Sequence, residues 1–221
     1  NNNTGLGHEV FDDLTSGDQN TGVGVQALAK VTTGSNNNAF GETALFTNTT
    51  GGNNVAMGRA ALESNTTADN NTAIGHQALK ANSTGATNVA VGSSALLANT
   101  TADNNVAVGA SALAANTGHS NVAVGKDALT ANLTASANTA VGFAAADANT
   151  TGSANTAIGS NALHSNTTGS QNTGLGENTL SSSTTGSNNT AVGYRALLSN
   201  TTGASNTSVG YQALDGNTTG S

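Results

Sequence analysis

The chain has 221 residues with no Pro, Cys or Trp, 3% aromatic and 8% charged residues, and a formal net charge of -7 with five Lys+Arg. The lack of Cys excludes disulfide and thiolate chemistry, and the acidic balance argues against nucleic acid or an anionic membrane surface as a partner. No stretch approaches the roughly 18 apolar residues of a membrane span, so we expect no membrane insertion.

One short phrase accounts for the whole chain. Copies begin at Asn3 and recur every 17 residues, except for one copy of 16 residues that begins at Asn105, which gives 13 copies. Numbered from its first Asn, the consensus copy is N-T-A-V-G-x-x-A-L-x-x-N-T-T-G-x-x. A short fixed period is typical of a solenoid, in which each unit packs on its neighbours. We therefore predict a single β-solenoid repeat array over residues 1–221 and, because it starts and stops within a copy, a fragment of a longer fibre.

The first elements of each copy are predicted strands rather than helices. The apolar runs are two to four residues long, are β-branched at position 4, and are interrupted by Gly every 7 to 10 residues. Strands are expected at N-T-A-V and at A-L, with corners at position 5, which is always Gly, and at position 15, which is Gly or Ala. The predicted fold class is all-β, a parallel β-solenoid (β-roll) of 13 coils of about 17 residues.

Position 1 is Asn in every copy, and stacked side-chain amides can hydrogen-bond from one coil to the next. We therefore predict a structural Asn ladder. Its members are Asn3, Asn20, Asn37, Asn54, Asn71, Asn88, Asn105, Asn121, Asn138, Asn155, Asn172, Asn189 and Asn206.

The strand at positions 2 to 4 and the segment at positions 8 and 9 are expected to supply the core. Positions 4 and 9 carry the large apolar side chains and are predicted to face inward, together with position 2. Position 3 is only Ala, Gly or Ser, which indicates a close packing contact, either between chains or within one crowded coil. All charged residues fall at positions 6, 7, 10, 11 and 16, which are predicted to face water.

One copy departs from this core pattern. Ala146 stands at position 9, where nearly every other copy has Leu. We expect a locally thinner core there, covered by Phe143 from position 6.

The N-T-T segment at positions 12 to 14 has two interpretations. As N-x-S/T sequons its Asn residues are candidate glycosylation sites, and as stacked side chains they would form a second ladder that closes a corner. Neighbouring coils are about 4.8 Å apart, too close for a bulky glycan on every coil, which favours the ladder. The sequons begin at Asn48, Asn65, Asn82, Asn99, Asn132, Asn149, Asn166, Asn200 and Asn217.

The stretch N-V-A-V-G-S-S-A-L at residues 88–96, with similar stretches in the next two copies, resembles the head repeats of trimeric autotransporter adhesins. Similar N-T-A-V-G-x-x-A-L runs occur in fibre proteins of phages and marine bacteria. The resemblance covers all copies and implies a left-handed β-roll, three of which pack side by side through apolar faces. The copies here are longer than in that family, because of the added N-T-T-G corner.

Residue types that carry catalysis or bind metals are scattered. The four His residues stand at positions 6, 6, 16 and 10 without a neighbouring carboxylate cluster, and Asp18, Asp69 and Asp103 share position 16 but lie two or three coils apart. The G-G-x-G-x-D pattern of calcium-binding β-rolls is missing. We therefore predict no enzymatic activity, no catalytic, cofactor-binding or metal residues, and no cofactor.

Two functions remain. The first is a non-catalytic structural shaft or head of an extracellular fibre or adhesin on a cell or virion surface; a phage tail-fibre segment is one form of it. We expect such a chain to self-associate, as a homotrimer or an end-to-end filament, and to contact a host surface or glycans. The second is ice binding through the Thr rows at positions 13 and 14. Leu133 interrupts those rows and the 16-residue copy has lost one Thr at Thr117, which favours the fibre.

Overall fold

The computed structural model describes residues 2–221, which form two compact units, residues 2–110 and 111–221. We call them the N-terminal and the C-terminal unit. Each unit is an all-β solenoid with one three-residue strand per coil and no helix among its described residues. A helix long and apolar enough to cross a membrane is accordingly not found in residues 2–221.

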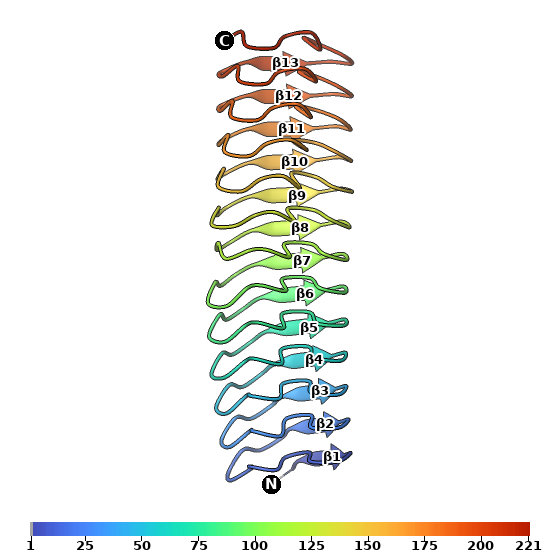
Figure 1. Ribbon diagram of the computed structural model, residues 1–221, viewed down its shortest axis with the longest axis vertical. Coiled ribbons are helices and arrows are strands. Elements are labelled where there is room, and N and C mark those ends of the chain that lie inside the picture. The colour runs from blue at the N-terminus through green and yellow to red at the C-terminus, as the bar shows by residue number, and fades with distance from the viewer. Residues whose placement is uncertain (1) are drawn as a thin grey trace. The chain divides into compact units, whose positions relative to one another are not determined.

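The strands of each unit are parallel and follow one another in chain order, as labelled in Figure 1. Pairing is in register at one full repeat, so that Thr21 pairs with Asn38 and Thr190 with Thr207. The strands of the N-terminal unit are β1 (Thr4–Leu6), β2 (Thr21–Val23), β3 (Asn38–Phe40), β4 (Val55–Met57), β5 (Thr72–Ile74), β6 (Val89–Val91) and β7 (Val106–Val108). Those of the C-terminal unit are β8 (Val122–Val124), β9 (Thr139–Val141), β10 (Thr156–Ile158), β11 (Thr173–Leu175), β12 (Thr190–Val192) and β13 (Thr207–Val209).

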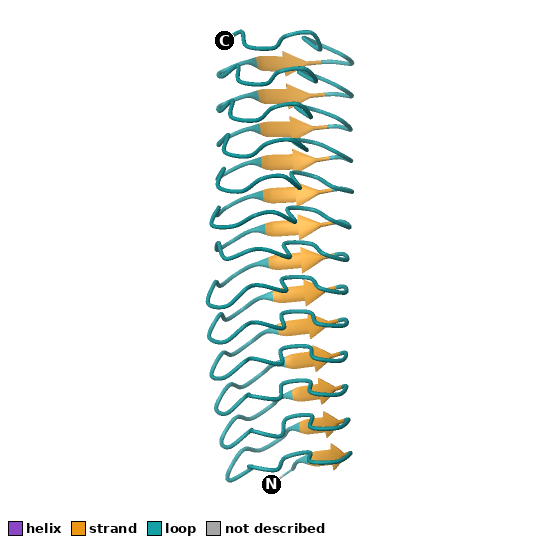
Figure 2. Ribbon diagram, viewed as in Figure 1, coloured by secondary structure: helices purple, strands orange, loops and turns teal. Residues whose placement is uncertain are grey.

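These strands confirm the parallel β-solenoid, but only one of the two predicted strands exists. Positions 2 to 4 are extended, whereas the A-L segment at positions 8 and 9 lies in turns, as Figure 2 shows. The reason is local backbone geometry, since position 9 has a positive φ, for example 51° at Leu79. A strand cannot continue through such a residue.

The two faces of the strand are inverted relative to the prediction. Position 3 is the inward one, and Ala73, Ala107 and Ala157 are fully buried. Positions 2 and 4 face outward, and Phe40, Met57 and Ile74 are 38–43% exposed. The predicted alternation has the correct period but the wrong phase, because the apolar side chains at position 4 form an exposed row and not part of the core.

The inward face is small because each coil is thin. Position 3 contacts positions 8 and 9 across the coil: a Cβ added at Gly174 would lie 2.8 Å from Oγ1 of Thr179. Position 9 provides the one large buried side chain of most coils, including Leu28, Leu96 and Leu197 at 0% exposure. The tight contact predicted for position 3 is therefore confirmed, and it lies within one chain.

Two small positions permit the coils to stack closely. At position 5 the Gly φ angles lie between 121° and 143°, a region that side chains rarely adopt, and a Cβ at Gly92 would lie 2.5 Å from the carbonyl oxygen of Gly109. Position 15 has no such φ requirement. It is small because a Cβ at Gly34 would lie 2.4 Å from the carbonyl oxygen of Gly51.

Three further positions carry side chains on left-handed backbone. Positions 7, 9 and 17 have positive φ in nearly every copy, as at Arg195 (57°), Leu197 (52°) and Asn188 (61°). For residues other than Gly, this conformation costs roughly 1–2 kcal/mol per residue. Neighbouring interactions must hold it in place, and the ladders described below do so.

The thin core at Ala146 is present, but Phe143 does not cover it. Ala146 is 2% exposed between the fully buried Leu129 and Leu163 of the adjacent coils. Phe143 is 52% exposed instead, with Nζ of Lys126 5.8 Å from its ring centroid. Position 6 lies on the outside of the coil and cannot reach the core.

Replacing Ala146 with Leu should raise the free energy of unfolding by about 1–2 kcal/mol, because added methylene groups would be buried between two Leu side chains. Chemical denaturation measures this change. As the matched control, Leu163→Ala should cost about 2–5 kcal/mol. A loss of more than about 1 kcal/mol in Ala146→Leu would show that the site is already filled.

Candidate functional surfaces

The predicted Asn residues at position 1 join each coil to the next through buried hydrogen bonds. The backbone N–H of Asn88 donates to Oδ1 of Asn71 at 2.9 Å, and Oδ1 of Asn88 accepts from the backbone N–H of Asn105 at 2.9 Å. Nδ2 of Asn88 donates to the carbonyl of Ala102 at 2.8 Å, at the position-15 corner. The ladder thus joins side chain to backbone between coils, and in several coils Nδ2 also donates to Oδ1 of the Asn one coil back, as predicted for stacked amides.

The Asn residues at position 12 form a second buried ladder. Nδ2 of Asn82 donates to Oδ1 of Asn65 at 2.9 Å and to the carbonyl of Gly85 at 2.8 Å, and Asn99 repeats the pattern one coil on. Of the sequon Asn residues, only Asn217 in the last coil is not fully buried. An N-linked glycan attaches at Nδ2, which here is enclosed and donating, so the geometry favours the ladder at these positions.

Ser183 interrupts the second ladder in the C-terminal unit. It occupies position 12, is fully buried, and is too short to reach the amide of the coil before it. Oγ of Ser183 and Oδ1 of Asn166 are both buried without a hydrogen-bond partner among the described residues. An unsatisfied buried polar atom costs about 1–3 kcal/mol, so this coil is a local weak point.

The two Thr residues after this Asn differ in what their hydroxyl groups do. At position 13 the hydroxyl donates to the next coil, as from Oγ1 of Thr150 to the carbonyl of Thr167 at 2.9 Å. At position 14 the side chains are exposed, and their hydroxyls form no hydrogen bond within residues 2–221. We call positions 13 and 14 the hydroxyl corner.

Position 16 adds a shorter row of contacts on the surface. Oγ of Ser170 accepts from the backbone N–H of Ser153 at 3.0 Å, and Oδ1 of Asp69 accepts from that of Gly52 at 2.6 Å. Backbone N–H groups of Asn2 and Gln19 hold the pKa of the Asp18 carboxyl below its ordinary value. The three Asp residues at this position thus pair with backbone in separate coils and do not come together.

One surface feature was not predicted: the outward side of the strands, which we call the sheet face. Position 4 supplies a row of apolar side chains and position 2 a row of Thr, Val and one Asn, with no charged residue in either row. The apolar rows are 36–43% exposed at Met57, Val108 and Val124. The lack of charged residues at positions 2 and 4 is the sequence pattern from which this contact face could have been predicted. Row members in the N-terminal unit are Leu6, Val23, Phe40, Met57, Ile74, Val91 and Val108, and in the C-terminal unit Val124, Val141, Ile158, Leu175, Val192 and Val209.

Charged side chains lie outside, as predicted, and several pair between adjacent coils at the same repeat position. Nζ of Lys80 lies 3.3 Å from Oε2 of Glu63, and Nε of Arg59 lies 3.3 Å from Oε2 of Glu42. Such exposed pairs contribute at most about 1 kcal/mol each. They do, however, favour one stacking register among nearly identical coils.

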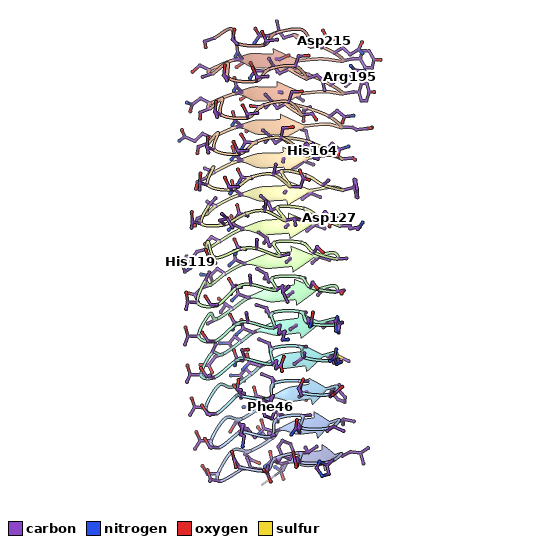
Figure 3. The ribbon with its side chains drawn as sticks, in the orientation of Figure 1. Phe46, His119, Asp127, His164, Arg195 and Asp215 are labelled. Atoms are coloured by element: carbon purple, nitrogen blue, oxygen red, sulfur yellow. The ribbon has the colours of Figure 1, made fainter. Side chains whose placement is uncertain are left out.

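The His residues lie on separate coils. His8 and His76 stand at position 6, while in Figure 3 His119 is labelled at the left edge and His164 nearer the middle of the view, at positions 16 and 10 of their copies. Within residues 2–221 no group of three or more His, Asp or Glu side chains is placed to hold a metal ion, and no pocket is found.

His8 and His164 each have an acidic neighbour, and the closer of the two contacts is that of His164, since Nδ1 of His8 lies 3.6 Å from Oε1 of Glu9. Nδ1 of His164 lies 2.7 Å from Oδ1 of Asp147, both at position 10 of adjacent coils, with the Asp side chain 27% exposed. Burial raises the pKa of Asp147 above its ordinary value of 3.8, an effect that His164 opposes and Asp127 adds to.

Comparison of the chain with protein-family models, curated proteins and solved structures gives no match.

Asp147→Asn should raise the melting temperature at neutral pH and lose that advantage in acid. Because the folded-state pKa is raised, folding favours the protonated carboxyl, so the ionised form lowers stability at pH values above that pKa. Thermal melts of both proteins between about pH 7 and pH 3 measure the difference, which should shrink as Asp147 becomes protonated. An advantage that is constant over this range would contradict the assignment to the charge of Asp147.

Proposed function

We propose that the chain is a non-catalytic structural segment of an extracellular fibre or adhesin on a cell or virion surface, whose copies self-associate through the sheet face. The observation that carries this proposal is the uncharged apolar row at position 4, exposed along the strands of each unit.

The sheet face has the chemistry of a protein contact surface. Contiguous apolar side chains that remain exposed on a folded protein mark interaction sites, because water contact with them is unfavourable. In the N-terminal unit the row includes the large side chains of Phe40, Met57 and Ile74. Their in-register strands keep them in one plane, so a second copy of the chain can cover them without rearrangement of the backbone.

The ladders support a mechanical role. Most coils are tied to the next by buried side-chain bonds at positions 1 and 12, by the hydroxyl bonds at position 13, and by the backbone pairs of the strands. A segment in which most repeats have the same bonds to their neighbours resists bending and local unfolding along most of its length, as a shaft requires. The similarity of the N-V-A-V-G-x-x-A-L copies to adhesin head repeats supports a homotrimer and a place outside the cell.

Association should depend on the apolar row. Light scattering after size exclusion should give the parent a mass near three times the 21.4 kDa of one chain. Ile74→Lys should shift the protein toward the single-chain mass, since a buried unpaired ammonium would oppose the contact.

The matched control is Ser93→Lys, which adds the same charge at exposed position 6 in the next copy. It should leave the mass unchanged, and both variants should retain the parent's circular dichroism spectrum. A parent that stays at the single-chain mass over the full concentration range would contradict self-association.

A further inference from the structure

The hydroxyl corner has a regularity that the fibre role does not use. Position 14 is Thr in 11 of the 12 copies that contain it and Ser in the other. Every one of these side chains is exposed, and none of their hydroxyls is bonded within the described chain. Exposed position 6, in contrast, holds His, Val, Glu, Arg, Ser, Ala, Lys, Phe or Tyr. The folded chain gives no reason to keep a hydroxyl at position 14, which indicates an external partner for it.

The corner is also held rigidly. The carbonyl of Thr167 accepts the backbone N–H groups of Thr150 and Thr151 at 2.9 and 3.1 Å, as well as the Thr150 hydroxyl at 2.9 Å. The same arrangement recurs one coil on, from Thr167 and Thr168 to the carbonyl of Thr184. Two parallel rows of Thr side chains are thereby fixed at the coil spacing of about 4.8 Å.

We propose that the hydroxyl corner binds the surface of ice. An ice surface exposes water molecules at every lattice repeat, so a Thr hydroxyl on each coil can find a hydrogen-bond partner there. The Thr methyl groups would order the water next to them. A glycan on each Thr would not fit at a spacing of about 4.8 Å. Protein interfaces depend on large anchor side chains, which positions 13 and 14 lack except at Leu133. No charged residue occurs at either position in any copy.

The irregular copies do not break either array. Thr117 and Leu133 belong to the two consecutive copies that cover residues 105–137, which include the boundary at Ala110 and Ser111. Outside them, the N-terminal unit keeps six consecutive copies with a hydroxyl at both positions, from Thr15 to Thr101, and the C-terminal unit keeps five from Thr150 to Thr219. Each unit therefore holds an uninterrupted array of its own.

Thermal hysteresis and inhibition of ice recrystallisation test the proposal on the full chain. The parent should show both activities. The double variant Thr67→Lys and Thr168→Lys, with one change in the middle of each array, should lose both, because a Lys side chain prevents close approach of the ice surface. A circular dichroism melt that matches the parent shows that the variant is folded.

Two further double variants serve as controls. Ser93→Lys with Ser160→Lys adds the same charges at position 6, where Lys126 occurs naturally, and should keep the activity. Ile74→Lys with Ile158→Lys changes the sheet face and should keep ice binding while altering association, so the two proposals fail independently. An inactive parent, an active corner variant, or loss of ice activity only in the sheet-face variant would each overturn the proposal.

Discussion

Hydrogen bonds from buried Asn side chains to the neighbouring coil are the constraint on which the rest of the structure depends. Most coils have a single large apolar side chain in their core and place residues at positions 7, 9 and 17 on left-handed backbone. Neither feature would hold a coil by itself, because the core is too small and the backbone conformation is unfavourable. The Asn amides at positions 1 and 12 fix both corners of the coil from the inside, and their bonds between coils form only when the coils stack in register. Each coil therefore requires its neighbours, and stacking and folding are one process.

The thinness of the coil explains why its surface is chemically unusual. Since only Ala, Gly or Ser fits at the inward position 3, the apolar residues of the strand at positions 2 and 4 face outward. The hydroxyl corner is outward for a similar reason, because Asn takes the inward place at position 12 and the following Thr residues remain at the surface. Two regular uncharged surfaces thus follow from one packing limit, and the proposed association and ice binding each use one of them.

Much of the fold could be predicted from the sequence, because the period alone specifies a solenoid, while Gly at position 5 and short β-branched runs specify parallel strands. The buried Leu at position 9, the outward charges and the ladder at position 1 also followed from residue type. The orientation of the strand did not, since hydrophobicity at position 4 is equally compatible with a core and with a contact face between molecules. The left-handed Leu at position 9 could not be predicted either, because its cost is offset by bonds in adjacent coils that a single copy does not reveal.

The break at Ser183 provides the most direct test of the ladder. Ser183→Asn would restore the missing amide and satisfy the buried Oδ1 of Asn166, while Asn82→Ser would create the same break in an intact region. Chemical denaturation of the two variants and the parent measures both changes. The ladder account predicts that Ser183→Asn raises the free energy of unfolding by about 1–3 kcal/mol and that Asn82→Ser lowers it by a similar amount. If both variants unfold at the same denaturant concentration as the parent, the buried amides do not hold the coils together.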